Sequence, residues 1–181
     1  MATFLSIGDN LRYYEGSVVR SCGEVWEHEI CRPDKLFRIA ILNWRKDGSC
    51  TIGLYSPEEL SNWHNLEDML PSHTGYWIEE DQLAEFFELE RLRLEITSNI
   101  TIRGKNMKGR KGTFLCPFDD SASMPIRYRI YTPQHLFVEL DDNVGGSGCD
   151  GLGKKGHCVM VPGNAVVFDD TKMARRLHLT K

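Results

Sequence analysis

The sequence has no run of apolar residues near the roughly 20 needed to cross a bilayer. Its first residues also lack the basic start and long apolar core of a signal peptide. We therefore expect a cytoplasmic protein that does not interact with membranes. In that compartment the six cysteines, which are widely spread along the chain, are expected to be reduced thiols.

An excess of basic charge is missing too. The chain of 181 residues has 22 Lys and Arg against 26 Asp and Glu, which gives a formal net charge of −4. It has no overall attraction to nucleic acid, so a nucleic-acid surface has to be a local patch. The hydrophobic share of 41% is that of a globular protein, and the length suits one large domain or two small ones.

Common signatures of catalysis are absent. The sequence contains neither the GxSxG motif of a nucleophile elbow nor the HExxH motif of a zinc hydrolase. The Gly-rich stretch 143–156 lacks the GxxxxGK[ST] pattern, and the residues after it predict a strand rather than a helix. This argues against a phosphate-binding loop, and a metal-dependent enzyme is our third hypothesis for function.

The CxxC pairs that zinc often uses are absent as well. Cys149, His157 and Cys158 lie close together in the sequence and offer the thiolate and imidazole ligands that zinc prefers. Neighbouring residues on a strand point to opposite faces, however, so His157 and Cys158 are poorly placed for one ion. We expect no cofactor, and zinc on these three residues is the alternative.

Helical periodicity is scarce, and most segments alternate between apolar and polar residues as strands do. Residues 37–44 and 50–55 flank Asp47-Gly48, a strong hairpin signal. The alternation places these apolar residues on one face of the first strand: Phe37, Ile39 and Ile41.

The second half of the chain repeats this pattern at residues 127–131 and 135–140, and another strand is predicted at 158–161. A short helical turn is expected near residues 80–87, where the acidic residues at the start suit a helix N-terminus. The predicted fold class is therefore all-β with a minor helical part.

Two stretches of the chain resemble each other. Residues 5–13 and 94–102 share their apolar positions and an Asn at the same step, with an offset of about half the chain. The boundary near residue 92 has no linker rich in Pro, Gly or Ser. We therefore expect two related units, residues 1–92 and 93–181, packed closely together.

Each predicted unit consists mostly of short strands, with a glycine-bearing loop and a final strand. This outline resembles the small bent barrel of the Src-homology-3 type. The resemblance implies two related Src-homology-3-like barrels packed together, with the short helical turn near the end of the first one.

Residues 100–114 read as a strand, a glycine, a basic loop with Lys-Gly, a second glycine and a strand. This pattern resembles the KOW motif of ribosomal proteins and transcription elongation factors, which touches RNA or polymerase. The resemblance implies contacts from Lys105, Lys108, Arg110 and Lys111, and four cations on one loop can neutralise phosphates. The alternative interpretation is a solvated turn in an acidic protein.

Residues 137–161 are similar to part of a CAP-Gly domain, a bent barrel that grips acidic C-terminal tails of other proteins. The binding loop of that family reads GKNDG, whereas this chain reads GGSGCDG, with lysines later at Lys154 and Lys155. The resemblance implies a partner-binding loop with Asp141, Asn143 and Asp150. Residues 41–48 further resemble the repeat of mind-bomb-type barrels.

Aromatic residues surround a loop in the first half. Trp63, Tyr76 and Trp77 flank a segment that carries His64 and His73. Trp and Tyr offer a large contact area with one polar group, which suits a protein partner. We expect Trp63 to be exposed, and we expect Trp77 to belong to the core.

The sequence thus predicts a non-catalytic binding module that grips a protein partner through its aromatic and Gly-rich loops. Tandem barrels of this kind resemble small bacteriophage proteins, some of which redirect host machinery. The alternative is an RNA- or DNA-binding protein that uses the basic loop together with Lys154 and Lys155.

Overall fold

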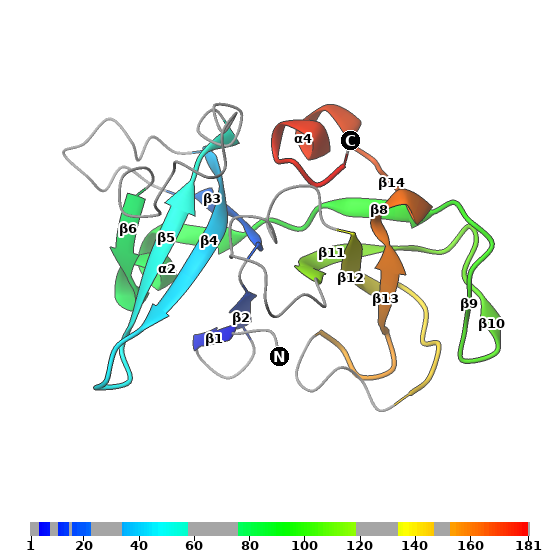
Figure 1. The fold of residues 1–181 in the computed structure, drawn as a ribbon, viewed down its shortest axis with the longest axis horizontal. Coiled ribbons are helices and arrows are strands. Elements are labelled where there is room, and N and C mark those ends of the chain that lie inside the picture. The colour runs from blue at the N-terminus through cyan, green and yellow to red at the C-terminus, as the bar shows by residue number, and fades with distance from the viewer. Residues whose placement is uncertain are drawn as a thin grey trace.

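The computed structural model of the chain describes residues 4–7, 11–14, 16–22, 34–57, 76–118, 134–146 and 153–180. Most of the regular structure in these residues is β-strand, which confirms the predicted all-β class with a minor helical part (Figure 1). The predicted strand at residues 127–131 lies outside the described residues. Among the described helices, none has the length and apolar composition needed to span a membrane.

The first half of the chain forms a five-stranded antiparallel sheet. It contains β3 (Val18–Ser21), β4 (Leu36–Trp44), β5 (Cys50–Tyr55), β6 (Tyr76–Glu79) and β7 (Phe87–Leu89). Their order across the sheet is β6-β5-β4-β3-β7. Strands β3 to β6 therefore follow one another, and β7 returns to pair with β3 on its open side.

Two local signals in the sequence explain this arrangement. The predicted turn between β4 and β5 forms at Asp47-Gly48, where Gly48 has a φ of 87° and the Asp47 carboxylate accepts a hydrogen bond from the N–H of Ser49 (3.0 Å). The predicted helical turn is α2 (Glu80–Phe86), whose start is stabilised by a capping box between Glu79 and Gln82.

The second half forms another five-stranded antiparallel sheet. It contains β8 (Arg93–Ile96), β11 (Lys111–Phe118), β12 (His135–Leu140), β13 (Cys158–Pro162) and β14 (Val166–Phe168). Their order is β13-β12-β11-β8-β14, and the 3₁₀-helix η2 (Gly163–Ala165) precedes the last strand. The predicted strands at 135–140 and 158–161 are confirmed as β12 and β13.

Three smaller elements accompany the sheets. The hairpin of β1 (Phe4–Ile7) and β2 (Leu11–Tyr14) precedes the first sheet, and the hairpin of β9 (Thr101–Ile102) and β10 (Lys105–Asn106) lies between β8 and β11. Helix α4 (Thr171–Arg176) follows β14 and lies beside the end of β8 nearer the first sheet (Figure 1). The N–H of Met173 donates to the side chain of its N-cap residue, Asp170 (2.9 Å).

The two sheets share the same strand order and pairing register. Val18 pairs with Arg38 in the first sheet, and Arg93 pairs with Thr113 in the second, each 75 positions after its counterpart. The register of the second strand is interrupted at equivalent places, between Ile39 and Ile41 and between Phe114 and Cys116. The final strand pairs with the first strand in both sheets.

This structural repeat differs from the repeat predicted from the sequence. Strand β1 pairs with β2 in a two-stranded sheet, whereas β8 pairs with both β11 and β14. Residues 5–13 and 94–102 therefore occupy different structural positions despite their similar patterns. The resemblance of the two halves resides instead in the strands from β3 and from β8 onward.

Two apolar cores support the sheets. The core of the first sheet contains Phe37, Ile39 and Leu42 from β4, and the pairing register of β4 with β5 shifts between Ile39 and Ile41. Phe37 and Ile39 lie in this core as predicted, and the side chain of Ile41 lies outside the described part of the structure. The core of the second sheet also takes in Val18 and Leu36 from the first sheet, so the two halves pack against each other.

The predicted burial of Trp77 is wrong. Its side chain is 38% exposed, and Trp44 at the end of β4 is 44% exposed. Trp77 pairs with Gly53 across β5 and β6. A Cβ added to Gly53 would lie 3.4 Å from the Trp77 ring, which is van der Waals contact. The glycine leaves the ring room to lie against the outer face of the sheet.

Candidate functional site

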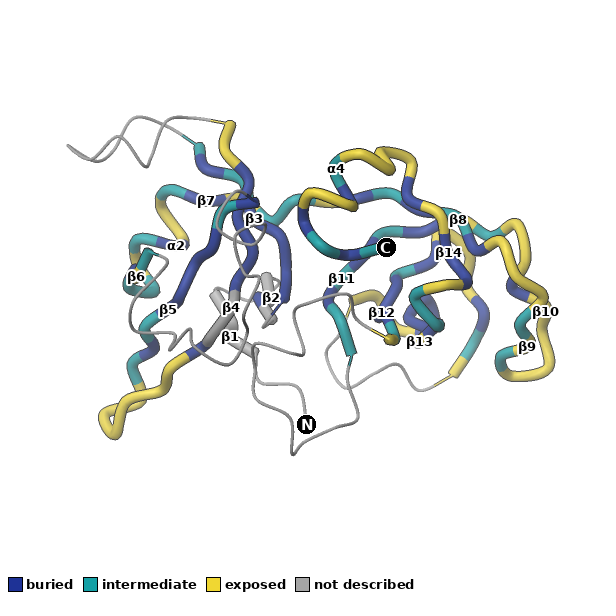
Figure 2. The backbone as a smooth tube through the Cα atoms, turned by 45° about the horizontal axis from the view of Figure 1, so that its top comes forward, coloured by how far each residue is buried: buried dark blue, intermediate teal, exposed yellow. Residues whose placement is uncertain are grey.

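The basic loop predicted from the sequence contains the β9–β10 hairpin and the residues that follow it. Arg103 and Gly104 form the turn with positive φ values of 52° and 74°, as tight two-residue hairpins require. Met107 is fully buried in the core of the second sheet and anchors the segment. Lys105 and Lys108 on either side of Met107 are exposed. Figure 2 shows that much of the β9–β10 hairpin is exposed.

Arginines fix this loop to the neighbouring Gly-rich segment. Arg110 donates from Nη1 to the Asp142 carboxylate (3.0 Å) and from Nε to the carbonyl of Asn106 (3.1 Å). The Arg103 guanidinium donates to the carbonyl of Gly145. The predicted phosphate contact Arg110 is therefore engaged in holding the loop in place.

Asp141 is also engaged in an internal contact. Both of its carboxylate oxygens accept hydrogen bonds from Arg93, at 2.8 and 2.5 Å. These bonds lower the pKa of Asp141 and raise that of Arg93, and this bidentate geometry is the stronger form of such a pair. Asp141 thus serves to tie β8 to the end of β12.

The ends of the Gly-rich segment are held together by backbone bonds. The N–H groups of Val144 and Gly145 donate to the carbonyl of Gly156, at 2.8 and 3.1 Å. The Asn143 side chain accepts from the N–H of Gly145 (2.8 Å), so this predicted partner-binding residue stabilises its own loop. Lys154, whose N–H donates to the Glu139 carboxylate (2.6 Å), follows with an exposed side chain.

Five lysines near these contacts have solvent-exposed side chains. We call them the lysine surface: Lys105, Lys108, Lys111, Lys154 and Lys155. None of them takes part in the ion pairs formed among the described residues. The acidic neighbours Asp141 and Asp142 are instead paired with arginines, and residues 96–118 contain no Asp or Glu. These two segments are thus locally rich in exposed lysines on a chain with net negative charge, and the acidic residue Glu95 lies opposite Lys111 across β8 and β11.

The residues predicted to hold a protein partner are only partly described. Trp63, His64, His73 and Asp150 lie outside the described residues. Tyr76 begins β6 and meets Phe37 edge to face, with 6.0 Å between ring centroids.

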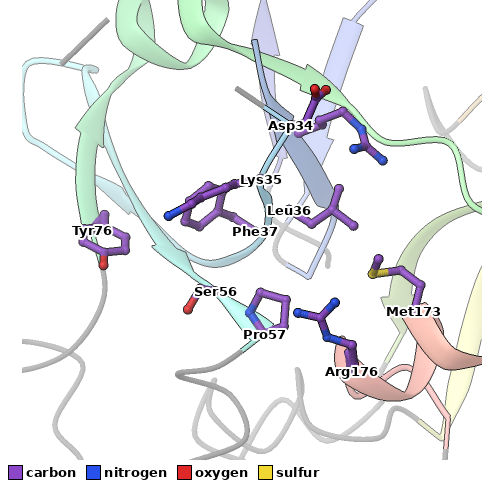
Figure 3. A pocket seen from close by; sticks show the side chains of 10 residues that line it. Asp34, Lys35, Leu36, Phe37, Ser56, Pro57, Tyr76, Met173 and Arg176 are labelled. Carbon is purple, nitrogen blue, oxygen red and sulfur yellow. The ribbon is translucent and has the colours of Figure 1, made fainter. Parts of the chain in front are cut away.

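Tyr76 also lines a cavity of about 400 Å³ between the first sheet and α4 (Figure 3). Sequence reasoning missed this cavity, because its walls come from residues as far apart in the sequence as Arg20 and Arg176.

The zinc alternative gains no cluster of ligands in the described part of the chain. Cys149 lies outside it, and the described residues contain no group of three or more His, Cys, Asp or Glu side chains that could hold a metal. His157 is buried with Nδ1 2.8 Å from the carbonyl of Leu140, and the Cys158 thiol lies 3.7 Å from the carbonyl of Lys154.

Comparison of the chain with protein-family models, with curated proteins and with solved structures finds no match. Function therefore has to be argued from the geometry of the chain itself.

Proposed function

We propose that the chain is a non-catalytic binding protein built from two Src-homology-3-like bent barrels, residues 1–92 and 93–181. Three features support this architecture: the shared strand order, the register irregularity within β4 and β11, and the short helix before the last strand of each sheet. A bulge bends a strand, which helps a small sheet to curl on itself.

The partner that the described geometry favours is RNA or DNA, held by the lysine surface. The observation that carries this proposal is the contrast between arginines engaged in internal contacts and five exposed lysines. Unpaired ammonium groups gain free energy when they replace the counterions condensed on phosphates. Lysine acts there as a point charge and does not read the base sequence.

Contacts to phosphates rather than to bases are also favoured by what surrounds the lysines. Among the described residues of the second half, the exposed large hydrophobic side chains are Met160 and Val167, and neither offers an aromatic ring for base stacking. We therefore expect binding with little sequence preference and a strong dependence on salt.

A salt titration tests this function. Binding of a fluorescent duplex should weaken so that the logarithm of the affinity falls linearly with the logarithm of the salt concentration. Changing Lys105, Lys108 and Lys111 to Ala should reduce the slope by about one for each lysine that no longer binds a phosphate.

The control changes three exposed cations elsewhere, Lys46, Lys172 and Arg175, to Ala, which alters the net charge equally. Equal loss of binding in both variants, or no binding at low salt, would refute the proposal.

A protein partner is the second candidate, including the phage-type role of redirecting host machinery. The specific observation in its favour is the Phe37–Tyr76 ring pair at the cavity. A Tyr76→Ala variant that keeps its circular dichroism spectrum should lose a partner captured from the native host by the unaltered chain. Retention of the same partner by that variant would remove this candidate.

A further inference from the structure

The cavity between the first sheet and α4 has walls of mixed character. Its apolar part is formed by Leu36, Phe37, Pro57 and Met173, and the hydroxyl groups of Ser56 and Tyr76 lie at its edge (Figure 3). A volume of about 400 Å³ is within the range of small-molecule sites. The cavity therefore has the size and lining to hold a small compound with an apolar body.

The two walls of the cavity are fixed relative to each other. Arg38 of β4 donates from Nη1 to the carbonyl of Leu177, directly after α4 (3.0 Å). Leu36 packs in the same apolar cluster as Ala174 and Leu177. The cavity is thus a preformed feature of the packed halves, which lowers the entropy cost of binding.

The described part of the cavity lining carries more basic than acidic residues. Among the described residues that line the cavity, three are basic, namely Arg20, Lys35 and Arg176, and Asp34 is acidic. Glu90 engages Arg20 through Nε (2.7 Å), and Lys35 is exposed and outside the ion pairs of the described residues. The N–H of Lys35 donates to the Ser21 hydroxyl oxygen (3.0 Å), which fixes the position of Lys35 at the rim.

We propose that this cavity binds a small organic anion with an aromatic or compact apolar body, such as an aromatic carboxylate or phosphate monoester. The apolar body packs against Phe37 and Met173, and the anionic group lies between Lys35 and Arg176. Guanidinium and ammonium donors form their strongest hydrogen bonds with such anions. The site is separate from the lysine surface and does not depend on nucleic-acid binding.

A ligand placed in this way contacts both halves of the protein. Phe37 lies in β4 of the first sheet and Lys35 directly precedes that strand, whereas Met173 and Arg176 belong to α4. Binding to the folded state alone raises the stability of the protein in proportion to the logarithm of ligand concentration. The bound anion should therefore stabilise the junction of the two halves.

Titration calorimetry with benzoate, phenyl phosphate and neutral benzamide tests the proposal on the full chain. We expect saturable binding of at least one anion, with one ligand per chain, and binding of benzamide at least about 10-fold weaker. Saturation by none of the three compounds, or equal affinity for benzamide, would overturn the proposal.

Matched variants locate the site. Arg176→Ala and Lys35→Ala should each weaken binding of the anion about 10-fold or more. Arg175→Ala on the same helix and Lys46→Ala in the β4–β5 turn, neither of which lines the cavity, should leave it unchanged.

Equal weakening in the control variants contradicts a site at the cavity. If Arg176→Ala fails to fold, Lys35→Ala decides alone. Duplex binding measured on the same variants should stay at the level of the unaltered protein, which separates this site from the lysine surface.

Discussion

Arg38 and Leu177 are joined by a hydrogen bond that connects the first sheet to the segment after α4 (3.0 Å). The Arg38 side chain is fully buried, and this burial lowers its pKa to about 9. Nε of Arg38 also donates to the carbonyl of Gly16 (3.3 Å). A buried charge is tolerated only with such partners, so Arg38 defines how the halves dock.

Replacement of Arg38 should therefore weaken the junction. We expect Arg38→Ala to lower the free energy of unfolding by about 2–4 kcal/mol, because it leaves a cavity and removes the donor to two buried carbonyls. Urea unfolding followed by circular dichroism measures this change. Arg45→Ala at an exposed ion pair is the control and should cost at most about 1 kcal/mol. Similar losses in both variants would contradict the role of Arg38.

Stability should depend on pH through His178. Burial, and secondly the charge of Arg38, lower the pKa of His178 below its ordinary value. The folded state then binds its proton less readily than the unfolded chain, so stability rises with pH across this range. The contribution is fully present above the ordinary pKa of about 6.5 and is lost as the pH falls through the lowered pKa.

A suitable control for this titration is His178→Asn. His178 has a φ of 54°, a conformation that Asn tolerates well, so the change removes the titrating group with little strain. Between about pH 7 and pH 5 the variant should lose less stability than the unaltered protein in thermal unfolding. Parallel pH curves for the two proteins would show that His178 contributes nothing.

Gly112 should resist substitution. A Cβ at this position would lie 2.5 Å from the carbonyl oxygen of Glu139 and 2.8 Å from a methyl group of Val138. Because a backbone atom is in the way, we expect Gly112→Ala to destabilise the protein by about 1–3 kcal/mol. Gly48→Ala is the control, since its Cβ meets no atom and only the positive φ is unfavourable. Chemical unfolding that ranks Gly48→Ala as the more damaging change would contradict this interpretation of β11.

Zinc content tests the alternative at Cys149, His157 and Cys158. We expect purified protein to contain less than about half an equivalent of zinc, because a structural site would be nearly filled. Metal analysis by mass spectrometry gives the number directly. A stoichiometric amount that is lost together with stability on chelation would establish the metal site.

Local sequence signals predicted several elements correctly. The strands around Asp47-Gly48, the helical turn after Glu79 and the strand at 135–140 each carry a short-range pattern that the tertiary structure did not override. Helix α4 was not predicted, although Asp170 as N-cap and the apolar Met173, Ala174 and Leu177 were a readable signal.

The correct repeat was hidden because equivalent positions carry different residues. Phe37 pairs with Val19 in the first sheet, and at the same register position in the second sheet Gly112 pairs with Leu94. The two sheets share the backbone register at this position, but Phe37 and Gly112 differ greatly in side-chain volume. A comparison of apolar patterns therefore aligned residues 5–13 with 94–102 instead of aligning the equivalent strands. The cavity was hidden for a related reason, since no local pattern connects Arg20 with Met173.

The bonds from Val144 and Gly145 to Gly156 have a practical consequence for engineering. They hold residues 144 and 145 next to residue 156, whatever the number of residues between them. For a segment already closed in this way, each doubling of length costs only about 0.6 kcal/mol of loop entropy. Foreign peptides grafted between residues 146 and 153 should therefore leave the host fold intact, which makes this segment a place to display an epitope or a fluorescent reporter.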